Sequence, residues 1–200
     1  MSAAIRLERL TGPALERHID DLARLRIAVF RDFPYLYDGS LDYERDYLRS
    51  YGRSRGSVIV AAFDGTAVVG AATALPMADE PDYVTKPFLA RGYDIARIFY
   101  FGESVLLKSY RGTGIGLGFF EHREAHARSF GEFDWFAFCG VDRPADHPKR
   151  PDDYIPLDRF WQKRGFARHP ELVAHFSWRD IGDSAQTDKP MVFWLKRPNP

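Results

Sequence analysis

The chain has 200 residues, with 28 basic and 28 acidic side chains when histidine is taken as neutral. This length predicts one domain, spanning residues 1–200, with a sizeable apolar core. The balanced charge leaves no overall field to recruit nucleic acid or an anionic membrane, and no basic stripe carries interleaved aromatic residues. We therefore expect neither as a partner.

The cysteine content and the N-terminus indicate the compartment. Cys139 is the single cysteine of the chain, which excludes an internal disulfide framework and is typical of a reducing environment. Residues 1–10 mix charged and apolar side chains without the apolar core of a signal peptide. No apolar run approaches the about 20 residues of a membrane span. These features predict a soluble, cytoplasmic protein.

The first part of the chain predicts an edge strand, two helices and a hairpin. Thr11 and Pro13 are typical of a helix start, and an apolar stripe at helical spacing continues to Phe30. The pair Asp64-Gly65 between two β-rich runs is a strong hairpin signal. The expected bounds are 3–10 for the strand, 11–30 and 41–51 for the helices, and 57–63 and 66–75 for the hairpin.

The remaining elements follow an excursion over residues 76–92, in which a short helix is expected at 83–90. Apolar, β-rich runs predict buried strands and a closing pair of strands near the C-terminus, and a helical pattern separates the first two of them. The expected bounds are 98–107 and 133–139 for the buried strands, 117–128 for the helix, and 172–178 and 191–196 for the closing pair.

A glycine-rich turn, Tyr110-Arg111-Gly112-Thr113-Gly114-Ile115-Gly116, joins the expected strand 98–107 to the expected helix 117–128. A helix that begins after such a turn leaves its first N–H groups unpaired at the positive end of its dipole. Those groups form a site for an anion, most often phosphate, and glycine lets the phosphate approach because it has no Cβ. The turn therefore predicts a phosphorylated ligand.

Spacing separates the known classes of phosphate-binding loop. The dinucleotide fingerprint G-x-G-x-x-G fails, because Leu117 and Phe119 stand where its third glycine would be. The nucleotide triphosphate loop fails as well, because no lysine follows these glycines. The remaining pattern, Arg111-x-x-Gly114-x-Gly116, resembles the Arg/Gln-x-x-Gly-x-Gly/Ala signature of the GNAT superfamily of N-acetyltransferases.

A second resemblance lies in residues 157–166, where this superfamily carries a short helix that ends in a tyrosine, three residues and then Gly-Phe. Gly165-Phe166 matches, as a helix stop and the start of the next strand. The tyrosine does not match, because Trp161 stands in its place. The two matches follow in the expected order, and the resemblance covers nearly the whole chain, most firmly residues 98–166.

The resemblance implies an α/β (α+β) fold of one domain, with a mixed, mostly antiparallel sheet of about six to seven strands flanked by helices. It implies that the parallel strands 98–107 and 133–139 splay apart to admit the pantetheine arm of acetyl-coenzyme A (acetyl-CoA), the expected co-substrate. Main-chain groups would then bind the cofactor and polarise its carbonyl. The implied contacts are Arg111, Gly112, Thr113, Gly114, Ile115 and Gly116 for the pyrophosphate, and Val105, Leu106 and Leu107 for the pantetheine and the carbonyl.

The superfamily transfers the acetyl group directly to an amine, which implies a base for the amine and a proton for the leaving thiolate. Glu103 is the candidate base, because a carboxylate in an apolar strand is costly unless it is paired or used. An ion pair with a neighbouring arginine is an equally open reading. The indole of Trp161 does not ionise usefully, so Tyr154, Cys139 and ordered water are the candidate acids, of which we name Tyr154.

The acceptor is predicted to be a primary amine of a small molecule or peptide, bound between the first helix pair and the long connection after Cys139. Aromatic residues within 30–37 and charged residues within 142–153 are placed to line it, although a solvated loop explains any single charged residue equally well. A non-catalytic CoA-binding module, and a structural relic without CoA affinity, stay open as alternatives.

His122 and His126 stand one helical turn apart, a spacing compatible with a metal ion. The glutamate of the zinc-protease pattern is missing and no third ligand is evident, so we expect solvated histidines and no metal. The oligomeric state is expected to be a monomer or a homodimer.

Overall fold

The computed structural model describes residues 5–198, which form one seven-stranded sheet flanked by helices. The order of the strands is β1-β2-β3-β4-β5-β7-β6, in which β4 and β5 are parallel and all other neighbours are antiparallel. The strands are β1 (Arg6–Leu10), β2 (Val58–Asp64), β3 (Ala67–Pro76), β4 (Ile98–Leu106), β5 (Trp135–Val141), β6 (Ala167–Trp178) and β7 (Thr187–Lys196). The α-helices are α1 (Gly12–Phe30), α2 (Leu41–Tyr51), α3 (Asp82–Leu89), α4 (Ile115–Phe130) and α5 (Asp158–Gln162). The predicted fold class is confirmed.

The N-terminal elements lie close to where the sequence predicts them. Thr11 is extended before α1 and Pro13 occupies its first turn, while the Ser40 hydroxyl accepts a hydrogen bond from the N–H of Tyr43 at the start of α2. β1 is an edge strand, as expected, and residues 3 and 4 of that expectation lie outside the described residues. Within the described chain, no helix combines the length and the apolar character that crossing a bilayer requires.

Several predicted bounds in the second half of the chain differ from the structure, including the start of β7, which is at Thr187 rather than at residue 191. α4 begins at Ile115 because Gly114 caps it in a left-handed conformation, and β5 begins at Trp135 rather than at residue 133. β6 starts at Ala167 rather than at residue 172. Its first half is polar and mostly exposed, and a register irregularity follows His169, so an edge strand facing solvent carries no apolar signal there.

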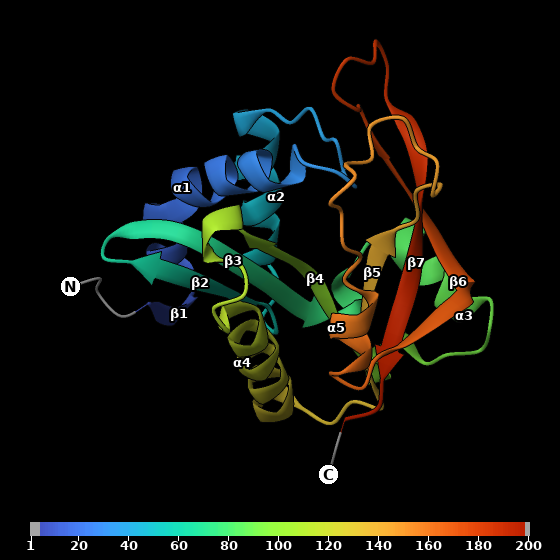
Figure 1. Cartoon of the computed structure of the whole chain (residues 1–200). Coiled ribbons are helices and arrows are strands. Elements are labelled where there is room, and N and C mark those ends of the chain that lie inside the picture. Colours follow the sequence, from blue (N-terminus) through green and yellow to red (C-terminus); the bar gives the residue numbers. More distant parts are fainter. Residues whose placement is uncertain (1–4, 199–200) are drawn as a thin grey trace.

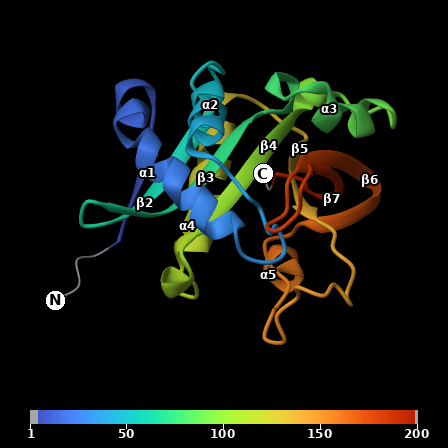
Figure 2. The ribbon, with the colours of Figure 1, turned by 90° about the horizontal axis from the view of Figure 1, so that it is seen from above.

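Helices cover both faces of the sheet (Figure 1). Buried side chains of α1, α2 and α3 form one apolar cluster with the sheet, and those of α4 form a second cluster on the opposite face, against which α5 also packs. Viewed from above, α1 and α2 lie over β2, β3 and β4 (Figure 2). Each strand between these layers therefore presents side chains to two different environments.

The parallel strands β4 and β5 pair only at their beginnings. Ile98–Tyr100 of β4 stands opposite Trp135–Ala137 of β5, and no pairing follows. Beyond that point β4 stays with β3 as far as Leu106, and β5 stays with β7 as far as Val141. The sheet is thereby divided into a β1–β4 half and a β5–β7 half (Figure 1). This is the splayed pair that the sequence predicts.

A β-bulge in β4 sets which side chains face α1 and α2. Thr73 stands opposite Glu103, whereas Leu75 stands opposite Tyr100, so β4 contains one residue more than β3 between these pairs. Side chains alternate along a strand, and the extra residue reverses the alternation. Tyr100 before the bulge and Val105 after it consequently belong to the same apolar cluster. Glu103 is turned to this face as well, where it meets α1 and α2.

Candidate active site

The glycine turn between β4 and α4 has the geometry of an anion site. Gly112 and Gly114 adopt φ values of 78° and 91°, which favour glycine, and a Cβ on either would meet nothing within 4 Å. Within residues 5–198, no acceptor takes the N–H groups of Gly112, Thr113 and Gly114. The first turn of α4 contains no acidic residue, so its dipole is not neutralised by a side chain of that turn. The turn is open, rich in donors and positively polarised.

Two side-chain contacts, one from Tyr110 and one from Arg111, hold this turn against the neighbouring strands. The Tyr110 hydroxyl donates to the Asp64 carboxylate at 2.7 Å, which ties the turn to the β2–β3 hairpin. The exposed Arg111 donates from Nε to the carbonyl of Leu106 at 3.2 Å. Its terminal guanidinium nitrogens stay available to an anion next to the turn.

At the end of β4, some peptide N–H and C=O groups bind β3 and others face the splay between β4 and β5. The N–H of Leu107 donates to the carbonyl of Val69 at 3.0 Å, and its carbonyl accepts from Tyr110 at 2.9 Å. Successive residues of a strand point their peptide groups to opposite sides, so Leu106 faces away from β3 and toward the splay. The N–H of Leu106 is therefore the group of the expected set best placed to meet a ligand, because the Leu106 carbonyl accepts from Arg111 and the N–H of Leu107 is already used.

Glu103 belongs to a buried charge cluster. Its side chain is only 8% exposed and forms an ion pair with Arg26 of α1. The same guanidinium pairs with Glu44 of α2, which is fully buried, and the Tyr47 ring centroid lies 4.1 Å from the guanidinium carbon. In their ordinary ionised forms the three groups sum to one negative charge. The ion pair named above as an alternative is present, and it leaves one carboxylate of the cluster without a cation of its own.

A ring of hydrogen bonds joins Glu103 to three residues, which are Thr73, Tyr51 and Tyr47. The N–H of Glu103 donates to Thr73 Oγ1 at 3.2 Å, and the Thr73 hydroxyl donates to Tyr51 Oη at 3.1 Å. The Tyr47 hydroxyl donates to Glu103 Oε2 at 3.0 Å, so the Tyr51 hydroxyl, 3.0 Å from it, donates to Tyr47. Burial raises the pKa of both tyrosines, which keeps them protonated. The ring fixes the orientation of the Glu103 carboxylate.

Arg123 of α4 supports the same bulge from the opposite face. Its side chain is buried, with the guanidinium carbon 4.5 Å from the ring centroid of Phe101 and 4.8 Å from that of Phe120. It donates to the carbonyls of Glu103 at 3.1 Å and of Thr73 at 3.4 Å. Within the described chain no carboxylate forms an ion pair with Arg123. Its Nε donates to the carbonyl of Phe119 at 3.2 Å, and its terminal nitrogen donates to the bulge carbonyls. We assign it as a positioning residue.

Gly102 is the point of closest contact in the bulge, and its replacement by alanine should disturb the ring. An added Cβ would lie 2.2 Å from Tyr51 Oη and 2.7 Å from Thr73 Oγ1. Because both groups are buried, we expect Gly102→Ala to lower the free energy of unfolding by about 1–3 kcal/mol in urea denaturation. Gly131→Ala is the control, since its Cβ would meet only ordinary contacts at 3.7 Å. Equal losses in the two variants would show that the bulge tolerates a side chain.

Trp161 packs against aromatic side chains of β5 and β7. Its ring centroid lies 5.0 Å from Phe138 of β5 and 5.1 Å from Trp194 of β7. A Cβ on Gly140 would come within 3.2 Å of the indole. The indole therefore packs between α5 and the sheet, on the side of the sheet that α4 covers, as a core residue would.

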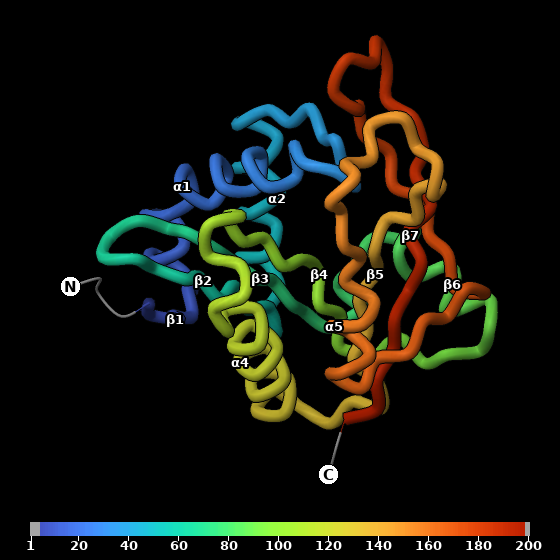
Figure 3. The backbone as a smooth tube through the Cα atoms, in the orientation of Figure 1, coloured from blue at the N-terminus to red at the C-terminus, as the bar shows by residue number. Residues whose placement is uncertain are grey.

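Tyr154 lies on the long connection between β5 and α5, which runs beside residues 31–40 (Figure 3). Its ring centroid is 4.7 Å from that of Phe33, and the Arg150 guanidinium lies 5.0 Å from the Tyr154 ring. Burial raises the pKa of Tyr154, and Arg150 opposes the rise. Arg143 donates to the carbonyls of Pro34 and Tyr35, so the connection and the aromatic corner do meet, as predicted.

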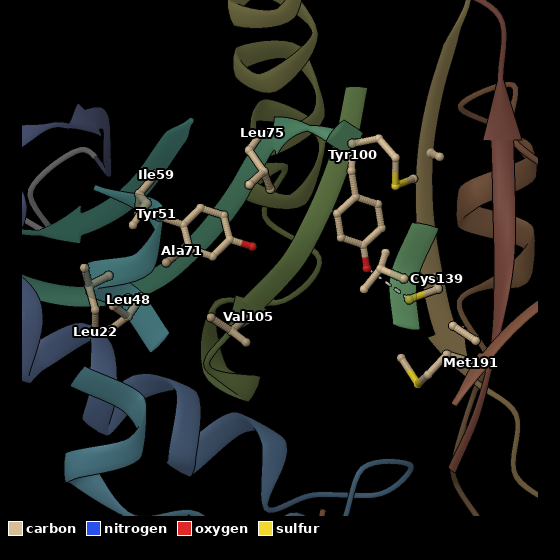
Figure 4. Close-up of a cluster of buried hydrophobic side chains, with 14 of the residues drawn as sticks. Leu22, Leu48, Tyr51, Ile59, Ala71, Leu75, Tyr100, Val105, Cys139 and Met191 are labelled. Carbon is tan, nitrogen blue, oxygen red and sulfur yellow. Dashed lines mark hydrogen bonds between the residues drawn. The ribbon is translucent and has the colours of Figure 1, made fainter. Parts of the chain in front are cut away.

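Cys139 closes the splay on the α1–α2 face. Its sulfur lies 3.1 Å from the hydroxyl of Tyr100, which reaches across from β4 (Figure 4). Burial raises the pKa of the Cys139 thiol to about 12. A free thiol has a pKa of about 8.5, so Cys139 is a weaker acid than the coenzyme A thiol it would have to protonate. Of the candidate acids, Cys139 is the least suited.

The histidine pair of α4 is engaged locally. His126 Nε2 lies 3.0 Å from the carbonyl of Gly56, and the ring stacks near Phe130. The Nδ1 atom of His122 is buried, so neither histidine is simply solvated as expected. Over residues 5–198, no group of three or more His, Cys, Asp or Glu side chains is arranged to hold a metal ion.

Four residues that shape the site were not predicted. Arg26 and Arg123 each follow a buried apolar residue of the same helix by one turn, and a cation within such a stripe was the available signal. Tyr47 and Tyr51 sit on the apolar face of α2, where aromatic residues ordinarily indicate core. Their hydroxyls acquire a role only because the bulge brings Glu103 beneath them.

Comparison with known proteins places the fold. No protein-family model matches this sequence, and no curated protein matches it. Solved structures do match over nearly the whole chain. An acetyltransferase of the GNAT family from Streptococcus pneumoniae superposes with a TM-score of 0.58 at 12% identity, covering 98% of this chain and 100% of the other. A ribosomal-protein-alanine N-acetyltransferase from Brucella melitensis gives a TM-score of 0.60 at 14% identity, covering 98% and 99%.

A third similar structure carries a ligand. A protein from Salmonella typhimurium, assigned as an acetyltransferase and solved with its cofactor acetyl-CoA, superposes with a TM-score of 0.62 at 10% identity, covering 99% of this chain and 96% of the other. Identities this low show the fold alone. The chain has the GNAT fold.

Proposed function

We propose that this protein is an acetyl-CoA-dependent N-acetyltransferase that moves an acetyl group directly to a primary amine of a small molecule or peptide. The observation that carries the proposal is the splay between β4 and β5, with the open glycine turn at the end of β4. The N–H groups of Gly112, Thr113 and Gly114, together with Arg111, would hold the pyrophosphate. The peptide groups of Leu106 face the splay, where the pantetheine would lie.

The chemistry requires a base and an acid. Acetyl-CoA, when bound, supplies the acetyl group as a thioester whose carbonyl carbon the amine nitrogen attacks. Glu103 would accept a proton from the amine, with Tyr47 and Thr73 holding its carboxylate and backbone in place. The excess negative charge of the Arg26 cluster favours a cationic acceptor. Tyr154 stays our candidate for protonating the thiolate.

Thermal unfolding with acetyl-CoA tests the cofactor assignment. A ligand that binds only the native state at about 100 times its dissociation constant adds about 2.7 kcal/mol to the free energy of unfolding, and we expect a corresponding rise in melting temperature. Gly114→Ala should weaken this rise. Gly92→Ala is the matched control, because Gly92 also has a positive φ (74°) and open surroundings but lies outside the turn. No rise with the unmodified protein would refute the proposal.

Release of coenzyme A thiol in the presence of a panel of amines then tests catalysis. We expect the protein to release thiol with at least one amine, and faster than with water alone. A non-catalytic CoA-binding module would show the thermal shift without thiol release. The buried, hydrogen-bonded carboxylate at Glu103 favours the enzyme over that module.

A further inference from the structure

A groove of about 910 Å³ opens beside the charge cluster on the α1–α2 face. It lies between the end of α2, the end of β3 and the excursion that joins β3 to β4. Its walls combine aromatic rings with charged and hydroxyl side chains, and its volume is in the range that small-molecule sites occupy. The lining includes Tyr47, Tyr51, Tyr83 and Phe130, with the carboxylates of Asp79 and Glu80.

Glu80 is the half-buried carboxylate of this groove that no side chain of the described residues contacts by an ion pair or a hydrogen bond. Asp79, by contrast, accepts a hydrogen bond from Ser54 at 2.5 Å. Burial, with the neighbouring Asp79, raises the pKa of Glu80 to about 7. Arg53 and Arg55 line the groove without pairing with it. Glu80 is half-buried, so its carboxylate stays open to a ligand, and a cation bound there would supply the missing counter-charge.

Residues of the groove wall contact Glu103, the proposed base. Tyr47 lines the groove and donates to Glu103 Oε2 at 3.0 Å, and Tyr51 lines it and lies 3.0 Å from Tyr47. Two residues of the groove wall therefore belong to the ring of hydrogen bonds that holds Glu103. Aromatic rings beside a carboxylate are the combination that recognises an organic ammonium group, by cation–π attraction and by charge.

We propose that this groove binds the acceptor as a protonated primary amine with an aromatic body, with Glu80 pairing with the ammonium group and Tyr47, Tyr83 and Phe130 enclosing the body. This inference names the acceptor of the proposed acetyltransferase, and it rests on that proposed function for the claim that the bound amine is acetylated. It assigns acceptor selection to the β3–β4 excursion, which supplies both Glu80 and Tyr83.

Calorimetric titration with phenethylamine tests the site without catalysis. We expect phenethylamine to bind the unmodified protein, and Glu80→Gln to weaken that binding at least tenfold. Phenethyl alcohol, which lacks the charge, should bind both proteins weakly and equally. Glu121→Gln is the control, because Glu121 is exposed on α4 and lies outside the groove. Equal binding of phenethylamine to the unmodified and Glu80→Gln proteins, or no binding to either, would overturn the inference.

The pH dependence gives a second readout. The carboxylate form of Glu80 becomes populated as the pH rises through about 7, while an alkyl ammonium with a pKa of about 10 stays charged. Affinity for phenethylamine should therefore increase from about pH 6 to about pH 8, and this increase should vanish in Glu80→Gln. The other charged or titratable groups that face Glu80 or line its groove are Asp79, Arg53, Arg55, Tyr47, Tyr51, Tyr83, Tyr100 and Cys139. Burial raises the pKa of the four tyrosines and of the Cys139 thiol, away from the range between pH 6 and pH 8.

The two proposals fail in different ways. If acetyl-CoA raises the melting temperature and thiol release with amines is the same in Glu80→Gln as in the unmodified protein, the acetyltransferase stands and this acceptor site is wrong. If phenethylamine binding depends on Glu80 but acetyl-CoA has no effect on melting, the amine site stands and the acetyltransferase proposal is wrong.

Discussion

Replacing Arg26 by methionine is expected to lower the free energy of unfolding by about 3–5 kcal/mol. The guanidinium is the shared counter-charge of Glu44 and Glu103, and all three side chains are at most 8% exposed. Methionine fills much of the same volume but leaves two buried carboxylates facing each other without a cation. The loss is measured as a shift of the urea denaturation midpoint at neutral pH.

Two further variants separate charge from packing in this experiment. Arg24→Met on the same helix removes a side chain that is 59% exposed, and it should change the stability by less than about 0.5 kcal/mol. Adding Glu44→Gln to Arg26→Met removes one stranded carboxylate, and should recover part of the loss. A loss in Arg26→Met as small as that in Arg24→Met would show that the cluster does not need its cation.

The fold was largely predictable because its signals are local. The helix start at Thr11 and Pro13, the Asp64-Gly65 turn and the strand–glycine–helix passage at Gly112 and Gly114 each determine structure within a few residues. β6 shows where such reasoning stops. Its first half joins the sheet through pairing with β7, but most of its side chains face solvent. The sequence of this half therefore has no apolar pattern that would predict a strand.

The site was predictable in the turn and only in part around Glu103. Glu103 stands out because it is a carboxylate in an apolar strand, but its direction depends on one extra residue in β4, which no spacing rule reveals. Its partners Arg26 and Tyr47 come from helices remote in sequence. Glu80 was missed because an acidic residue in a proline-containing excursion looks like an ordinary surface group until the groove around it is seen.

Glu103→Gln is expected to lower the rate of acetyl transfer about 10²–10⁴-fold, the usual contribution of a general base. The amide can still accept the hydrogen bond from Tyr47, and Arg26 keeps Glu44 as its partner, so the fold should survive the change. Affinity for acetyl-CoA should stay the same, because the turn at Gly112–Gly116 and the main chain of β4 are predicted to bind it. Turnover is measured by thiol release at saturating amine, and affinity by the thermal shift.

Glu44→Gln is the control that decides between a base and a structural ion pair. It removes the same charge from the same guanidinium, but on α2, where no strand of the splay is involved. If Glu103 acts as the base, Glu103→Gln loses turnover and Glu44→Gln keeps it. If the carboxylate only balances Arg26, both variants fold, bind acetyl-CoA and turn over alike. Both glutamates pair with Arg26, so a difference in turnover between the two variants would come from the position of Glu103 on β4.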